Sequence, residues 1–239
     1  MINQKSFDVS KKKLRYNIRP QRVFLYFSMI WGLIMIFIIP PFMVPDEPAH
    51  FYRSYQVSEG KLIGKVEDNK LGEYLPLSLS KLHNEVFLAR DSFQMDKAFI
   101  NRCMSIKLNR DDEDFLFFPN TSLYSPIPYI PQALGIIAGK LFDAPPLILL
   151  YLGRLINLLV WILILYTAIK QIPIYKWLFM VLALLPMSMN QASSVSADAL
   201  VNALSFLMIA LTLKWSFDVK KIMGIPELLI IISISVLLT

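Results

Sequence analysis

Residues 45–53 read Pro-Asp-Glu-Pro-Ala-His-Phe-Tyr-Arg and come directly after the first long apolar run of the chain. Two adjacent carboxylates, an imidazole and a guanidinium therefore lie at the C-terminal end of a predicted membrane span. A proline is excluded from a helix interior but suits a first helical position, so the sequence predicts a helix that begins at Pro48. That helix should continue to about Glu59, because the next residue, Gly60, is a typical helix stop.

The charged side chains of this stretch are the first candidate functional group. On the predicted helix Glu47, His50 and Arg53 are spaced three residues apart and share one face. A carboxylate, an imidazole and a guanidinium on one face can move protons and bind phosphate. The alternative is that Asp46 or Glu47 only caps the helix, and the local pattern does not decide between the two interpretations.

The composition is typical of a membrane protein that crosses the bilayer several times. Of the 239 residues, 55% are apolar and 18% are charged, and the mean hydropathy is +0.50. The net charge of +6 does not indicate nucleic-acid binding, because many basic residues lie beside the first apolar run. A single cysteine, Cys103, excludes an internal disulfide, and two histidines, His50 and His83, exclude a histidine-rich metal site.

A retained membrane helix is predicted over residues 22–43, after a polar cytoplasmic tail at residues 1–21. The apolar run has about the ~20 residues that cross a bilayer, and it lacks the cleavage site of a signal peptide. Basic residues beside a first span mark the cytoplasmic side, so the N-terminus is predicted to be inside. The basic residues concerned are Lys5, Lys11, Lys12, Lys13, Arg15, Arg19 and Arg22.

Residues 44–146 are predicted to form a large extracytoplasmic loop with interfacial or re-entrant helices. Loops of this length usually carry function or a small structure of their own. The acidic run 111–114 could bind a cation, but a solvated turn is favoured because the spacing of a calcium loop is absent. The prolines and tyrosines of residues 124–131 suit a membrane interface, and the apolar run 133–142 is too short for a crossing.

Residues 147–239 are predicted to hold about four membrane helices. Basic residues follow the first and the third of them, so every basic cluster falls on the predicted inner side. The last run is apolar to its end and shorter than ~20 residues, so we expect an incomplete span in a chain truncated at its C-terminus. The four runs are 147–169, 177–190 with a kink at Pro186, 198–213 and 225–239.

Two charged residues accompany these later spans. Arg154 lies about two turns into the second span, and Asp198 lies at the outer end of a later one. A charge at the depth of Arg154 costs on the order of 2.5–3.5 kcal/mol, so it should have a partner or a function. In one interpretation, Arg154 and Asp198 form an ion pair or extend to the membrane interface. In the other, Arg154 binds a lipid-linked phosphate, and Asp198 lies with Asp46 and Glu47 at the outer end of the first span.

Four motifs, in order along the chain, resemble those of a bacterial membrane family catalogued as a domain of unknown function, DUF2142. That family is similar in layout to the GT-C glycosyltransferases. These are membrane enzymes with a large first outer loop and an acidic pair just after the first span, and they take sugars from polyprenyl-phosphate carriers. The resemblance implies an all-α polytopic integral membrane protein with a GT-C-like N-terminal half. The motifs span residues 45–60, 124–132, 153–157 and 185–200.

The resemblance also implies a reaction, the transfer of a sugar from a polyprenyl-phosphate carrier to a cell-envelope polymer or lipid on the outer face of a bacterial inner membrane. Asp46 would match the base that acts on the acceptor hydroxyl, with Glu47 beside it. A divalent metal could assist, but no metal ligands are indicated and no other cofactor is expected. The expected partners are the lipid-linked sugar, the acceptor and membrane lipids, not nucleic acid. The candidates for binding the phosphate and substrate are His50, Arg53, Arg154 and Asp198.

Two other functions stay open at this point. In a transporter or flippase for the lipid-linked sugar, Arg154 and Asp198 would line a pathway. In a non-catalytic assembly protein, the outer loop would dock a partner. Transporters bind their substrates near the membrane midplane, whereas the charges here cluster at the outer mouth apart from Arg154. This layout modestly favours an enzyme.

Overall fold

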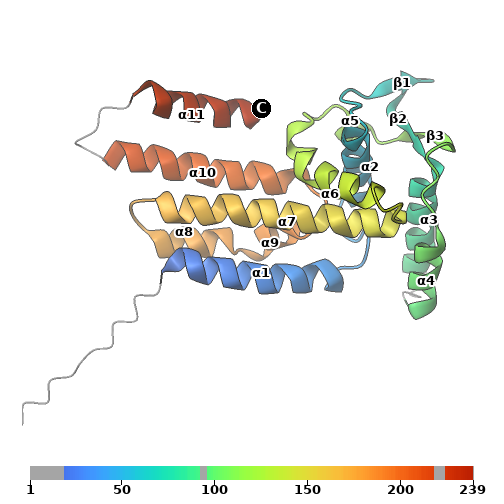
Figure 1. The fold of residues 1–239 in the computed structure, drawn as a ribbon, viewed down its shortest axis with the longest axis horizontal. Helices are drawn as coiled ribbons and strands as arrows, with labels where there is room; N and C mark the ends of the chain where they lie inside the picture. Colours follow the sequence, from blue (N-terminus) through green and yellow to red (C-terminus); the bar gives the residue numbers. More distant parts are fainter. Residues whose placement is uncertain (1–18, 92–95, 218–223, 239) are drawn as a thin grey trace, which may run out of the picture.

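The computed structural model describes residues 19–91, 96–217 and 224–238, which are mostly helical (Figure 1). Residues 1–18 of the predicted tail and the lysines at 220–221 lie outside these ranges, whereas residues 20–21 of that tail belong to the first helix. The helices are α1 (Pro20–Ile38), α2 (Glu47–Ser58), α3 (Leu77–Asp91), α4 (Lys97–Ser105), α5 (Pro119–Ser122), α6 (Ile130–Lys140), α7 (Pro146–Gln171), α8 (Lys176–Ala183), α9 (Pro186–Ala192), α10 (Ala197–Phe217) and α11 (Ile225–Leu237). A 3-10 turn, η1 (Ile127–Tyr129), precedes α6, and the strands are β1 (Lys65–Glu67), β2 (Lys70–Pro76) and β3 (Glu113–Phe117).

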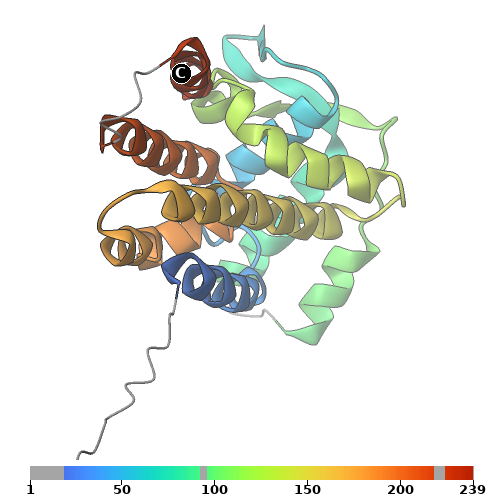
Figure 2. The same cartoon turned by 60° about the vertical axis from the view of Figure 1, so that its left-hand side comes forward.

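Within the described residues, three helices are long and apolar enough to cross a membrane, namely α1, α7 and α10. They run side by side in both views, with the strands beyond one end of them (Figures 1 and 2). Since α7 packs against both α1 and α10, it lies at the centre of the three. The chain is therefore a mostly helical membrane protein, as its composition predicted.

Prolines set the ends of these helices. Helix α1 has Pro20 at its first position and stops at Ile38, earlier than the predicted end at residue 43, because two prolines, residues 40–41, follow at once. Helix α7 likewise begins at Pro146. A proline that follows a helix cannot continue its hydrogen-bond ladder, so the bounds follow from local chemistry.

Residues 176–192 form two short helices where the sequence predicted one kinked crossing over 177–190. Helix α8 ends at Ala183, and α9 begins with Pro186. The missing N–H and the ring of a proline interrupt a helix rather than only bending it here. Both short helices pack against α1 and α7. The predicted last run, 225–239, appears as α11, which contacts α10.

The predicted outer loop contains a three-stranded antiparallel sheet, which an all-α architecture did not include. Strands β1 and β2 form a hairpin whose turn residues, Asp68 and Asn69, have φ angles of 47° and 61°. Aspartate and asparagine tolerate this left-handed conformation, which tight hairpin turns require. Leu75 of β2 and Leu116 of β3 share a hydrophobic core with side chains of α2 and α3.

Helix α6 lies directly against the N-terminal half of α7, and a glycine allows this contact. A Cβ atom at Gly135 would lie 2.4 Å from the carbonyl oxygen of Leu152. Only a residue without a side chain lets the two backbones approach so closely. The preceding turn, η1, contacts both α2 and the start of α10. The packing of α6 therefore brings Tyr129, the last residue of η1, next to α2.

Candidate functional site

The acidic pair lies at the start of α2, which begins at Glu47 and so matches the helix predicted from Pro48. Asp46 occupies the N-cap position, but its side chain makes no capping hydrogen bond. Its φ angle is 58°, a left-handed conformation that only a few residue types adopt readily. The Asp46 carboxylate is exposed, whereas the Glu47 carboxylate is buried. The two neighbouring acids therefore have different environments.

Glu47 and Arg154 form a buried ion pair in which both side chains are 0% exposed. The Nε atom of Arg154 donates to Oε1 of Glu47 at 2.8 Å, and Nη2 donates to Oε2 at 2.6 Å. The backbone N–H groups of Phe42 and Val195 donate to the same carboxylate at 2.9 and 3.0 Å. Charge-assisted, two-pronged contacts of this kind are strong, and here the contacts to Glu47 join α2, α7, the segment after α1 and the segment before α10.

The remaining donors of Arg154 bind the end of α1. Its Nη1 donates to the carbonyl oxygens of Ile36 and Ile39 at 3.1 and 2.8 Å, and its Nη2 donates to that of Pro40 at 3.1 Å. The last carbonyls of a helix lack helical partners, so a guanidinium satisfies them. All five N–H donors of Arg154 are thus engaged. Arg154 pairs with Glu47 rather than with Asp198, and it retains no donor for a phosphate.

Arg53, a second predicted phosphate ligand, is also buried. Its Nη1 donates to the side-chain oxygen of Gln56 at 2.6 Å, and its Nη2 donates to the carbonyl oxygens of Leu62 and Tyr124 at 2.9 and 2.5 Å. These contacts fasten two distant loop segments to α2. These hydrogen bonds give Arg53 a structural role, although its Nε atom is buried and has no hydrogen-bond partner among the described residues.

His50 lies beside two acids and a tyrosine. Its Nδ1 atom is 2.9 Å from the hydroxyl oxygen of Tyr129, which is fully buried. Burial lowers the pKa of His50, while the nearby carboxylates of Asp198 and Asp46 act to raise it. Asp198 is exposed in the first turn of α10 and accepts a hydrogen bond from Gln191 at 2.9 Å. We call Asp46, His50, Tyr129 and Asp198 the His50 cluster, in which the imidazole lies close enough to both carboxylates for their charges to affect its pKa.

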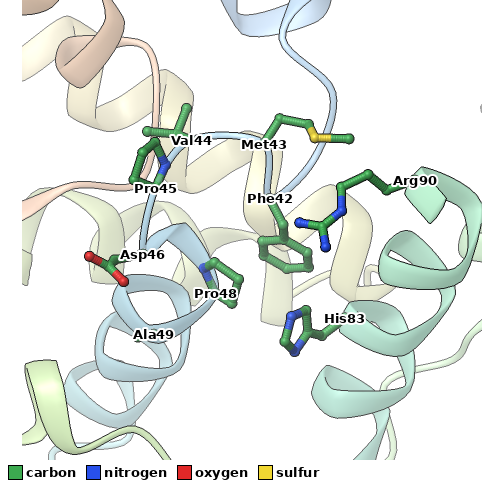
Figure 3. Close-up of a pocket in the computed structure, with 9 residues that line it drawn as sticks. All are labelled: Phe42, Met43, Val44, Pro45, Asp46, Pro48, Ala49, His83 and Arg90. Carbon is green, nitrogen blue, oxygen red and sulfur yellow. The ribbon is translucent and has the colours of Figure 1, made fainter.

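A hollow of about 450 Å³ adjoins Asp46 (Figure 3). One wall is the segment between α1 and α2, and the other is α3, from which His83 and Arg90 extend. His83 contacts the hydroxyl of Tyr52 through Nδ1 at 3.3 Å, and burial, followed by the charge of Arg90, lowers the pKa of His83. We call this space the Asp46 hollow; its lining residues are Phe42, Met43, Val44, Pro45, Asp46, Pro48, Ala49, His83 and Arg90.

Residues from all four sequence motifs contact one another next to this site. Besides the pair of the first and third motifs, Gln132 of the second motif donates to Asn157 of the third at 3.0 Å and to the carbonyl oxygen of Ser196 at 2.8 Å. Asn157 in turn donates to the carbonyl oxygen of Ser194 at 2.8 Å. These buried contacts hold the segment before α10, and so position Asp198.

No group of three or more histidine, cysteine or acidic side chains in the described ranges lies where it could hold a metal ion. In the acidic run, Asp112 lies 3.8 Å from Lys81 and Glu113 lies 3.4 Å from Lys61, as expected for solvated surface charges. Metal assistance therefore stays a prediction.

Sequence reasoning missed three residues of this site. Tyr129 was assigned only to the membrane interface, and His83 and Arg90 were given no role. The prolines around Tyr129 indicate a rigid backbone, which could have marked Tyr129 as a residue held in a fixed position. No local pattern marks His83 or Arg90, because these side chains reach the hollow only through the packing of α3.

Comparison with known proteins identifies a family for most of the chain. Residues 29–239 match the model of a family described as "Predicted membrane protein (DUF2142)". This match confirms the resemblance that the four motifs indicated. No curated protein and no solved structure matches the chain.

Proposed function

The chain belongs to the DUF2142 family of predicted membrane proteins, and from that premise we propose that it acts as a membrane-embedded glycosyltransferase. The proposed reaction transfers a sugar from a polyprenyl-phosphate carrier to a cell-envelope acceptor on the outer face of a bacterial inner membrane. The observation that carries the proposal is the contrast between the two acids. Asp46 presents an exposed carboxylate at the edge of a hollow, whereas Glu47 is bound from all sides.

In this reaction Asp46 takes the proton of the acceptor hydroxyl as the hydroxyl oxygen attacks the anomeric carbon of the sugar. The bond between that carbon and the phosphate oxygen breaks, and its electron pair leaves with the polyprenyl phosphate. A base for this step has to be accessible and ionised. No described residue forms an ion pair or a hydrogen bond with the Asp46 carboxylate, so it is available to a hydroxyl group.

Glu47 and Arg154 support Asp46 without taking part in the chemistry. A non-glycine residue at positive φ stores backbone strain, which persists only where the surroundings hold it. The buried pair fixes the residue that follows Asp46 to both α1 and α7. We therefore assign Glu47 and Arg154 as positioning residues rather than as a base and a phosphate ligand.

The His50 cluster offers a path for the proton that Asp46 receives. His50 is neutral near pH 7 because burial lowers its pKa, so it can accept a proton. The Tyr129 hydroxyl holds its ring, and Asp198 lies near enough to stabilise the charged form. The proton can then pass from His50 to solvent at the exposed Asp198.

The test compares Asp46→Asn with the wild-type protein in cells, with membrane levels matched. Asparagine also tolerates a left-handed conformation, so the change removes the base and keeps the backbone. We expect transfer to fall by about 10²–10⁴-fold, the typical contribution of a general base. Envelope glycan should be lost, and the unused lipid-linked sugar should accumulate, as measured by mass spectrometry.

A matched control is Asp68→Asn, which alters another exposed aspartate at positive φ, in the turn of the β1–β2 hairpin. This variant should make normal glycan. If Asp46→Asn also makes normal glycan at normal membrane levels, Asp46 is not the base and the proposal fails.

The transporter interpretation receives less support from the same geometry. It required Arg154 to line a pathway, but all five donors of Arg154 are bound to Glu47 and to α1. A residue so engaged cannot also bind a passing substrate without breaking a buried ion pair.

A further inference from the structure

The Asp46 hollow has a basic wall as well as an acidic edge. We propose that Arg90 and His83 on α3 form the binding site for the phosphate of the lipid-linked donor. This inference rests on the proposed function and supplies what that function lacks, since the phosphate ligands expected from the sequence are engaged elsewhere. The ligand class is a phosphate ester carried on a long isoprenoid chain.

The placement of the two side chains is the first support. Arg90 and His83 extend from α3 toward Phe42, across the hollow from the segment that holds Asp46 (Figure 3). The guanidinium carbon of Arg90 lies 4.7 Å from the centre of the Phe87 ring, a contact that steadies the side chain on α3. Both groups and Asp46 line the hollow of about 450 Å³.

The chemistry of the two groups fits a phosphate ester. Arginine stays charged at all relevant pH values, and its planar fork binds two phosphate oxygens at once. His83 is neutral near pH 7, and its Nδ1 atom is engaged with Tyr52. Its other ring nitrogen is therefore the one that can contact a ligand. One cation and one neutral hydrogen-bonding group can stabilise the charge that develops on a departing phosphate.

The other arginines near the site are unsuited to this task. Arg154 has all five donors engaged, and Arg53 is buried with both terminal nitrogens bound. Arg90 is exposed to solvent and lines the hollow. Among these three arginines, Arg90 alone combines exposure with a position facing Asp46.

The position relative to the membrane favours a phosphate carried on a lipid. The segment that lines the hollow follows directly after Ile38, the last residue of the candidate span α1. The end of a span lies at the level of lipid head groups. A carrier whose chain lies in the bilayer would present its phosphate at that level.

The separation of Asp46 and Arg90 also agrees with the reaction. In a displacement with inversion, the hydroxyl attacks the face of the sugar opposite to the leaving phosphate. The base and the phosphate site must then lie on opposite sides of the sugar. Asp46 and Arg90 line opposite edges of the hollow, and the Asp46 carboxylate, which is turned away from Arg90 in Figure 3, has to rotate about its side-chain bonds to face a sugar held between them.

The experiment measures binding to the full chain in lipid nanodiscs, with three ligands: a polyprenyl phosphate, the matched polyprenol without phosphate, and a soluble hexose 1-phosphate. We expect the wild-type protein to bind the polyprenyl phosphate more tightly than the polyprenol. Arg90→Ala should weaken polyprenyl-phosphate binding by about 10-fold to 100-fold, the usual effect of losing a charged hydrogen bond. His83→Gln should have a smaller effect in the same direction.

The matched control is Arg102→Ala, which removes an exposed arginine of α4 that pairs with Glu85 and does not line the Asp46 hollow. It should bind all three ligands as the wild-type protein does. Wild-type affinity in Arg90→Ala would overturn the inference, and so would equal affinity of the wild-type protein for polyprenol and polyprenyl phosphate. Equally tight binding of the hexose 1-phosphate would overturn the assignment to a lipid carrier.

The two proposals fail in different ways. Asp46→Asn should not lose affinity for polyprenyl phosphate, because the change removes a negative charge from the hollow and leaves Arg90 and His83 in place. If Arg90→Ala binds normally while Asp46→Asn loses glycan, glycosyl transfer stands and the phosphate site is wrong. If Arg90→Ala loses binding while Asp46→Asn makes normal glycan, the phosphate site stands and the base is wrong.

Discussion

At the scale of single residues, Asp46 and Glu47 show that two identical functional groups can have different roles because the fold gives them different environments. The sequence makes them equivalent, two neighbouring carboxylates after a span. In the fold, Glu47 accepts from a guanidinium 107 positions away along the chain, while Asp46 remains exposed. The distant partner, Arg154, decides which acid is structural and which is available for chemistry.

The first residue-scale prediction concerns the buried pair. In Glu47→Gln, one carboxylate oxygen becomes an NH₂ group that faces the donors of Arg154 and the backbone. We expect the free energy of unfolding to fall by about 3–5 kcal/mol, because a buried charge loses its partner. Thermal unfolding of the purified protein in detergent measures this change.

The control for that change is Glu113→Gln, which breaks an exposed pair with Lys61. Exposed pairs contribute about 0–1 kcal/mol, so its unfolding temperature should hardly move. A Glu47→Gln protein as stable as the Glu113→Gln protein would show that the pair does not hold the fold. It would also return Glu47 to the list of possible catalytic residues.

At the scale of elements, the packing of α6 against α7 brings the residues of the site together. This contact carries Tyr129 to His50 and Gln132 to Asn157. It depends on the backbone approach at Gly135, where any side chain meets the carbonyl of Leu152. A small residue in a short apolar helix thus has consequences for residues that are distant in sequence.

We therefore predict that Gly135→Ala displaces α6 and destabilises the protein by about 1–3 kcal/mol, the usual cost of overpacking. The matched control is Gly153→Ala on the facing helix, where the new Cβ would lie 3.4 Å from its nearest neighbour, a side-chain carbon of Val195. Alanine favours a helix over glycine, so this control should be neutral or slightly stabilising. Equal unfolding temperatures for the two variants would contradict the role given to Gly135.

At the scale of the whole molecule, the question is which side of the membrane the sheet and the hollow face. The basic residues before α1 predict a cytoplasmic N-terminus, which places residues 44–146 outside. The loop between α7 and α8 would then be inside. The proposed reaction requires this orientation, because its acceptor belongs to the cell envelope.

Cysteine labelling tests the orientation. The native Cys103 is buried, so the unaltered chain should react little with a membrane-impermeant maleimide. In right-side-out vesicles, Asp111→Cys should be labelled, because Asp111 is exposed in the predicted outer region. Tyr175→Cys replaces a side chain that is 74% exposed after α7 and should react only once the vesicles are opened. The reverse pattern would invert the topology and remove the outer-face reaction.

The sequence by itself determined the class of protein, the start of α2 and the family, and it placed apolar spans where α1, α7 and α10 lie, although it predicted two further spans that the described residues do not form. These features depend on local physics: a bilayer requires about 20 apolar residues, and prolines end or begin helices wherever they lie. The hairpin turn at Asp68 and Asn69 also had a local signal, but its short strands lack a strong alternation of apolar and polar residues.

Only the tertiary structure decided the partner of Arg154, the contact of Tyr129 with His50, and the hollow between Asp46 and Arg90. Each joins side chains from elements far apart in sequence, and helix packing sets which of them meet. A buried charge must find a partner, but the sequence does not say which of several acids lies within reach. The sequence therefore identified groups able to do chemistry, and the fold separated those buried in structural contacts from those exposed at the hollow.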